Sequence, residues 1–457
     1  MKDLTQGSLS GHLLAMSLQM GLGLVLQTLY FFVDLYFVAQ LGSATIAGVS
    51  AAGNVTFVVI AMTQALGVAT VALVSHAVGR KDQAGANHIF NQSVSMAMVA
   101  TLVLLSGGYG FASAYMNLFA ADAETAREGI AFLHGYLPGM ALQFASVVMA
   151  SGLRGTGIVK PTMIVQALSV VLNAALAPVL IAGWGTGRPL GALGAGLATS
   201  GAVTVGVVLL AVYFMRLEHY VHFDVKQWKP RLATWSRMLQ VGIPAGGEFL
   251  MLALLTSVAY WAVRQFGADA QAGYGIGGRI NQMLFVPAMA IAFSAAPVGG
   301  QNFGARRADR VRETFRVAVV YTTIAMALLT VLAQWKAEAF ARIFTDHPGA
   351  VAVAAEFLHY LSWNFVGAGI VFCCSSLFQA MGNTWPSLAS SGFRLVIFAV
   401  PGLWMARQPW FEMRHLFMLS IATTGLQALA SYILLRWQFR ERLDKLPARA
   451  ALSPGPA

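Results

Sequence analysis

The sequence predicts an all-α, polytopic membrane protein with twelve transmembrane helices in two pseudo-symmetric six-helix lobes. Three observations support this fold class. Of the 457 residues, 57% are hydrophobic and only 10% are charged, whereas soluble domains carry about 25% charged residues. Apolar stretches recur along the chain and are long enough to cross a hydrocarbon core of roughly 30 Å as helices. The third observation is an internal repeat at one fixed offset.

The apolar stretches favour helices over the strands of a membrane β-barrel. They are rich in Leu, Val, Ala and Met, and they contain Gly and Pro. Barrel strands are about 10 residues long and alternate polar with apolar side chains. We therefore expect twelve helical spans, near residues 13–39, 51–76, 88–110, 130–152, 161–183, 190–214, 238–264, 281–302, 313–335, 352–378, 386–406 and 413–436.

Glycine-rich breaks between the apolar stretches are expected to end helices. The clearest are Gly107-Gly108, Gly183-Trp184-Gly185 and Gly299-Gly300.

The positions of Lys and Arg predict how the spans are oriented. The loops after every second span and the C-terminal tail hold 19 of these residues, and the alternate loops hold eight. Positive residues stay on the cytoplasmic side, so both termini are expected in the cytoplasm. A multi-pass protein of the cell inner membrane is the expected localisation.

The net charge of +11 is not read as a sign of nucleic-acid binding. The basic residues lie mainly in short loops, where they meet anionic membrane lipids, and no basic groove with interleaved aromatic residues is evident. Membrane lipids are therefore expected partners, nucleic acid is not, and the chain is expected to be a monomer.

The longest cytoplasmic connection divides the chain near its middle. It contains Lys226, Lys229, Pro230 and Arg231. We expect an N-terminal lobe at 1–215, a cytoplasmic linker at 216–237, a C-terminal lobe at 238–437 and a cytoplasmic tail at 438–457.

A repeat at an offset of 225 residues relates the two halves. Gln40 falls on Gln265, and Gly79 falls on Gly304. Only nine of fifty pairs are identical across positions 33–82, but the same offset still relates Ser151, Gly157 and Pro161 to Ser376, Gly382 and Pro386. Two halves of six spans enter the membrane in the same direction, as in transporters that work by alternating access. Channels usually show a filter or a charged ring, and neither is evident here.

Asp34 is the clearest candidate for a functional group. It lies within the first span, and no residue at helical spacing carries a positive charge. A charge in the membrane interior costs at least ~2.5–3.5 kcal/mol, so such an acid favours proton uptake or the binding of a sodium ion. A structural hydrogen bond to a neighbouring helix is the alternative. Gln27 lies two turns earlier and can share the same wall of a cavity.

Two further ionisable residues lie within spans. Glu248 follows Pro244 and Gly246-Gly247, a sequence typical of the loosened helices that line transport cavities, although it can also lie near the cytoplasm and be solvated. Arg394 is a single cation in the eleventh span, for which a structural role is favoured. Buried amides and hydroxyls add weaker candidates, because such groups commonly hold membrane helices together; they include Asn173, Thr199 and Gln282.

Nothing in the sequence indicates an enzyme, a resident metal or a cofactor. The nine histidines show no metal-ligand spacing, and Cys373 and Cys374 lie side by side in an apolar span. No phosphate-binding loop of the GxxxxGK[ST] type occurs, which argues against a built-in ATPase. An H⁺ or Na⁺ gradient is the expected energy source.

Four segments resemble the multidrug and toxic compound extrusion (MATE) family. They are 33–42 in the first span, 153–161 after the fourth, 191–199 opening the sixth and 299–305 closing the eighth. The resemblance extends from about residue 8 to residue 440. It implies two six-helix lobes and the export of cationic amphipathic compounds against H⁺ or Na⁺.

The same resemblance implies roles for individual residues. Asp34 would couple transport to the ion, and Gln27, Asn173 and Thr199 would line the cavity of the N-terminal lobe. If sodium is the coupling ion, Asp34, Asn173 and Thr199 would bind it.

Many relatives carry an acid just before the span-5 proline, where this chain has Ala177. Sodium-coupled relatives place acids in spans 7 and 10, whereas this chain has Glu248 nearer Pro244 than their span-7 acid and only Glu356 near the start of span 10. These departures leave Asp34 almost alone and favour proton coupling.

A flippase for lipid-linked saccharides, from the same superfamily, is the alternative function. Such proteins tend to have more spans and several cationic residues that hold pyrophosphate, whereas here the membrane interior offers mainly Arg394.

Overall fold

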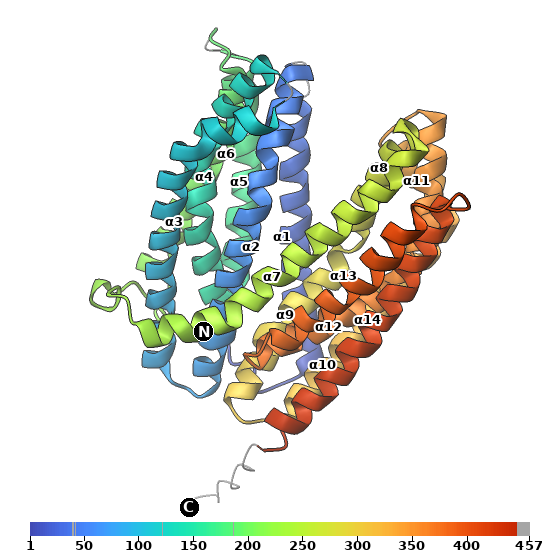
Figure 1. Ribbon diagram of the computed structural model, residues 1–457. Coiled ribbons are helices and arrows are strands. Elements are labelled where there is room, and N and C mark those ends of the chain that lie inside the picture. Colours follow the sequence, from blue (N-terminus) through green and yellow to red (C-terminus); the bar gives the residue numbers. More distant parts are fainter. Residues whose placement is uncertain (39–40, 42, 121, 186, 446–457) are drawn as a thin grey trace, which may run out of the picture. The chain divides into compact units, whose positions relative to one another are not determined.

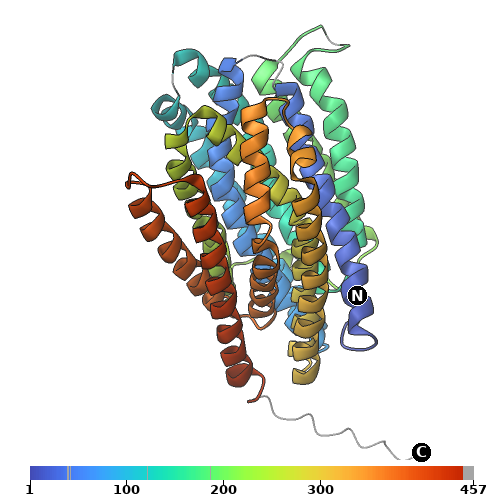
Figure 2. The ribbon, with the colours of Figure 1, turned by 90° about the vertical axis from the view of Figure 1, so that its right-hand side faces the viewer.

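The computed structural model describes residues 1–38, 41, 43–120, 122–185 and 187–445, and it leaves out the side chains of 30–35, 43, 44 and 54. Within this part of the chain every regular element is helical. Ten helices are each long and apolar enough to cross a membrane, and two bent pairs raise the number to twelve if each pair is one span. The prediction of an all-α, multi-pass membrane protein is confirmed (Figures 1 and 2).

The first half of the chain forms six continuous helices. Each covers all or nearly all of one of the six spans expected there, and four of them extend beyond the apolar stretch by a turn or more. They are α1 (Leu9–Val38), α2 (Ser43–Gly79), α3 (Gln83–Phe119), α4 (Ala123–Gly155), α5 (Lys160–Ile181) and α6 (Gly191–Arg216).

The second half forms the remaining spans, of which two are broken. The helices are α7 (Leu232–Val263), α8 (Ala268–Leu284), α9 (Val286–Gly304), α10 (Ala308–Arg342), α11 (Pro348–Leu361), α12 (Asn364–Ala380), α13 (Trp385–Met405) and α14 (Met413–Arg442). The axes of α8 and α9 differ by 44°, and those of α11 and α12 differ by 59°. Pro287 explains the first break, because it has no N–H and its ring crowds the carbonyl four residues earlier.

The 225-residue repeat is reproduced in the helix boundaries. α2 covers 43–79 and the pair α8/α9 covers 268–304, while α4 covers 123–155 and the pair α11/α12 covers 348–380. Lys81 and Arg306, one offset apart, both have positive φ, as do Gly157 and Gly382. Equivalent positions therefore make equivalent turns.

Two of the three expected glycine breaks are wrong. α3 runs through Gly107-Gly108, and α9 runs through Gly299-Gly300. A Cβ on Gly299 would come within 2.9 Å of the Ala380 Cβ, so this glycine permits close packing of helices rather than ending one. The break at Gly183 is as expected, since α5 ends at Ile181 and Gly183 has φ +74°.

By packing, the chain divides into two compact units. Unit 1 consists mainly of Leu18–Val74 and Gln83–Leu250, and unit 2 consists of Lys2–Ser17, Ser75–Asp82 and the chain from Met251 onward. This division differs from the expected lobes, because the start of α1 and the end of α2 belong to unit 2 and the start of α7 belongs to unit 1. In unit 1, a Cβ on Gly242 would meet the backbone of Ala65 in α2, so α7 and α2 approach closely there.

Candidate functional site

The candidate site in unit 1 is built around the end of α1. Val38 is buried in a cluster with Ala177 and Ile181 of α5 and with Ala195 and Ala198 of α6. The last turn of α1 therefore lies against both helices. These residues are small or branched and apolar, so they allow the three helices to pack without polar groups at this level.

Three of the sequence candidates lie next to this cluster along their helices. Asp34 precedes Val38 by one turn of α1, and Asn173 precedes Ala177 by one turn of α5. Thr199 directly follows Ala198 in α6. Asn173 is fully buried and Thr199 is 5% exposed, and the Thr199 hydroxyl donates to the Ala195 carbonyl at 3.1 Å. The side chain of Asp34 lies outside the described residues.

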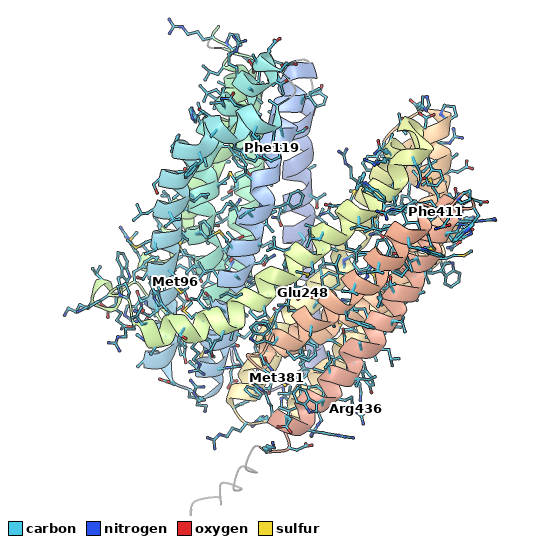
Figure 3. All side chains as sticks on the ribbon, viewed as in Figure 1. Met96, Phe119, Glu248, Met381, Phe411 and Arg436 are labelled. Carbon is cyan, nitrogen blue, oxygen red and sulfur yellow. The ribbon has the colours of Figure 1, made fainter. Side chains whose placement is uncertain are left out.

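Gln27 and Glu248 also belong to unit 1. Gln27 is exposed on α1, two turns before Asp34. Glu248 is half-buried within α7, along which Figure 3 labels it. Pro244 does not end α7, which continues from Leu232 to Val263. The predicted loosening of α7 at this point is therefore not a helix break.

Gln282 lies in the other unit. It is exposed near the end of α8, and unit 2 includes all of that helix. Five of the six candidates thus belong to unit 1, and the sixth does not.

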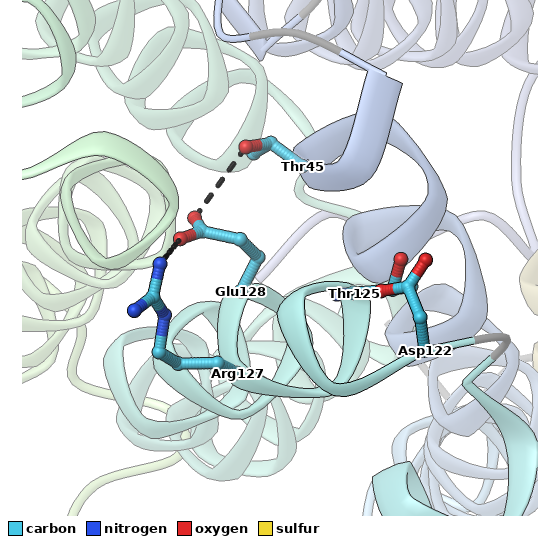
Figure 4. Close-up of polar contacts among 5 residues, drawn as sticks. All are labelled: Thr45, Asp122, Thr125, Arg127 and Glu128. Carbon is cyan, nitrogen blue, oxygen red and sulfur yellow. Dashed lines mark hydrogen bonds and ion pairs between the residues drawn. The ribbon is translucent and has the colours of Figure 1, made fainter.

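Hydrogen bonds in unit 1 hold the starts of α2 and α4. The Asp122 carboxylate accepts from the Thr125 backbone N–H at 2.7 Å and caps α4 (Figure 4). This backbone hydrogen bond lowers the pKa of Asp122. Thr45 at the start of α2 donates to Glu128 at 3.4 Å, and Glu128 pairs with Arg127 at 3.8 Å. The first turn of α2 and the second turn of α4 are therefore linked.

The first half of the eighth span was missed from sequence. Residues 265–280 were expected to form a loop, but α8 begins at Ala268 and carries exposed Gln271, Arg279 and Gln282. The polar residues lowered the apolar signal there. The repeat contained part of the missing information, since the expected start of the second span at 51 falls on 276, five residues before the expected start at 281.

The match to a known protein family occurs twice along the chain, once in each half. The MatE family model matches residues 20–179 and again residues 244–405, so one family pattern recurs at nearly the offset of the repeat. The probable multidrug resistance protein YpnP of Bacillus subtilis is 25% identical over 421 residues, which is 89% of each chain. An FAD transporter of Shewanella oneidensis is 24% identical, over 85% of this chain and 86% of the relative.

A solved structure has the same fold. It is the outward-facing conformation of a multidrug resistance MATE family transporter of the MOP superfamily. It matches with a TM-score of 0.90 and 21% identity, over 97% of this chain and 98% of that chain.

Proposed function

Because the chain belongs to the MATE family of transporters, we propose that it is a secondary active multidrug exporter. It exchanges cationic amphipathic compounds for H⁺, or for Na⁺, by alternating access. It resides in the cell inner membrane with both termini in the cytoplasm, and it acts as a monomer.

The position of Asp34 is the observation that carries this proposal. An acid within a membrane span is costly and usually has a function. One turn beyond it, α1 packs against α5 and α6 at Val38, and the buried amide of Asn173 and hydroxyl of Thr199 lie at adjacent levels of those two helices. Polar groups that can assist a proton or a sodium ion are thus gathered around the level of the acid.

Competition for the Asp34 carboxylate couples the export of the organic cation to the entry of the ion. The carboxylate attracts an organic cation while it is ionised. Uptake of one proton neutralises it and removes that attraction, so the cation leaves. If sodium is the ion, the carboxylate keeps its charge and binds Na⁺ together with the Asn173 and Thr199 oxygens.

Purified protein in proteoliposomes tests the proposal. A fluorescent lipophilic cation is loaded, and its efflux is followed while the pH gradient and the sodium gradient are imposed separately. Efflux that follows the pH gradient alone supports H⁺ exchange, and efflux that follows the sodium gradient alone supports Na⁺ exchange. Efflux indifferent to both gradients refutes antiport.

A further inference from the structure

Arg394 lies in the middle of α13, a 21-residue helix, and therefore at the depth where a membrane tolerates charge least. Its Nη1 donates to Gln427 Oε1 at 3.3 Å. Its Nε is buried and has no hydrogen-bond partner. Arg394 forms no ion pair with an acid among the described residues. The hydrogen bond shown for this guanidinium, which has five N–H donors, is thus made to a neutral amide oxygen.

Gln427 is held in the orientation that serves Arg394. Its Nε2 donates to Ser391 Oγ at 3.3 Å, which leaves Oε1 for the guanidinium. Gln427 is 4% exposed, and Ser391 lies one turn before Arg394 on the same helix. The arginine is therefore positioned by a buried network, which preorganises its donors.

Two tyrosines extend this polar region to an exposed face of α8. Tyr274 lies close enough to Arg394 to interact with it electrostatically, and its ring meets that of Tyr260 edge to face, with centroids 5.1 Å apart. Tyr260 interacts in the same way with Arg279, which is exposed on α8. We call Tyr260, Tyr274, Arg279 and Arg394 the arginine–tyrosine array. All four belong to unit 2.

The repeat shows that the array is not needed to build a six-helix half. The positions that correspond to Arg394 and Arg279 in the first half are Ser169 and Asn54. Those that correspond to Tyr260 and Tyr274 are Leu35 and Val49. The equivalent helices of the first half form without these four side chains, so a packing role common to both halves does not account for them.

The array therefore combines two positive charges, phenol donors and aromatic surface, with no acid paired to either arginine among the residues described. Arginine donors match carboxylate and phosphate oxygens. The exposed ring of Tyr260 offers surface for a flat apolar group, whereas the Tyr274 ring already packs against Phe357 and Phe417. We propose that the array binds an anionic group of the transported molecule, a carboxylate or a phosphate, so that the protein exports zwitterionic amphiphiles as well as cations. The array belongs to unit 2, whereas Asp34 belongs to unit 1.

A matched pair of dyes tests the proposal in proteoliposomes. One is a rhodamine with a free carboxylate, which is zwitterionic, and the other is its methyl ester, which is only cationic. In Arg394→Gln, we expect at least a tenfold loss of kcat/KM for the free acid and less than a twofold change for the ester. Arg394→Lys should recover part of the acid transport, because it restores the charge without the fork of donors.

Control variants distinguish a defect of this site from misfolding and from a failure of the proposed export function. Arg279→Gln, at an exposed position, should weaken acid transport in the same direction even if Arg394→Gln folds poorly. Arg342→Gln, which removes an exposed arginine paired with Glu338, should alter neither dye. Equal losses for acid and ester in both array variants would overturn the proposal, as would unchanged transport of the acid.

The lipid composition of the vesicles identifies the source of the anionic group. If the defect of Arg394→Gln appears with both dyes but only in vesicles that contain phosphatidylglycerol, a lipid headgroup occupies the array and the proposal is wrong. A defect specific to the acid in pure phosphatidylcholine supports it. Failure of the wild-type protein to export even the ester would instead count against the export function itself.

Discussion

Single residues make the two halves of this chain electrically different. Asp34 has Ala259 as its counterpart one offset later, and Ala259 is buried in an apolar cluster with Ala262 and Val263. Arg394, conversely, has Ser169 as its counterpart. The helices are common to both halves, whereas Asp34 and Arg394 each have an uncharged residue as their counterpart.

Replacing Asp34 tests its role directly. Asp34→Asn retains the size and removes the charge, so the site can neither take up a proton nor attract a cation. We expect loss of drug resistance in cells at a normal expression level, measured as the minimal inhibitory concentration of a lipophilic cation. Asp346→Asn, at an exposed loop acid, is the matched control and should retain resistance. Unaltered resistance in Asp34→Asn would refute the mechanism.

Substitution of Gly79 tests how closely the end of α2 packs against the end of α9, where Gly304 is its equivalent. A Cβ on Gly79 would overlap the backbone carbonyl of Gln301, and a Cβ on Gly304 would overlap that of His76; these four positions are related in pairs by the offset. Gly79→Ala should therefore destabilise the protein by about 1–3 kcal/mol, as overpacking does. Thermal unfolding in detergent measures this. Gly110→Ala, with no neighbour within 4 Å, should be neutral or stabilising, and equal melting temperatures for both variants would contradict the overlap.

At the scale of helices, equivalent backbone carbonyls in the two halves lack their helical N–H donor, each for a different reason. In α4, Pro138 has no N–H for the His134 carbonyl, and the Tyr109 hydroxyl donates to that oxygen at 2.9 Å. One offset later the helix is broken near Trp363, and Gln334 donates to the His359 carbonyl at 2.6 Å. Since a membrane offers few other donors, each half provides one from the preceding long helix.

A double substitution tests this reading of α4. Tyr109→Phe leaves the His134 carbonyl without its donor and should cost about 1 kcal/mol of stability. Pro138→Ala supplies an N–H at the position that reaches the same carbonyl, so the double variant Tyr109→Phe/Pro138→Ala should regain the lost stability. Melting temperatures of the four proteins measure the coupling. Strict additivity of the two changes would show that the hydroxyl does not serve this carbonyl.

At the scale of the whole chain, the connection between α6 and α7 is held rather than loose. Asn91 of α3 donates to the His222 carbonyl at 2.9 Å. Gln92 donates to the carbonyls of Gln227 and Lys229 at 2.5 Å and 3.0 Å. Both amides are fully buried, so α3 fixes the path of the connection within unit 1.

Limited proteolysis tests this anchoring. In Gln92→Ala the backbone around residues 227–229 loses its donors, and we expect trypsin to cut after Lys226 and Arg231 roughly tenfold faster, which corresponds to about 1.4 kcal/mol of opening free energy. Fragment bands on a gel over time give the rates. Gln143→Ala, in α4, is the control and should be cut at the wild-type rate. No acceleration in Gln92→Ala would mean that the connection is held by other contacts.

The amino-acid sequence by itself determined the fold class, the membrane setting and the repeat. Apolar runs long enough to span a bilayer are a local property, and a fixed offset of 225 residues is visible without any structure. The ionisable candidates Asp34, Glu248 and Arg394 were evident for the same reason, since a charge is conspicuous in an apolar run.

Only the tertiary structure decided which residues meet. The donors from Tyr109 and Gln334 to the two histidine carbonyls, and the network at Arg394, join groups of different helices that are 25 to 36 residues apart in sequence. The division within α1 and α7 likewise depends on which surfaces pack together. Hydropathy averages over a window of residues and records neither the direction of a side chain nor its neighbour, so these contacts follow from packing alone.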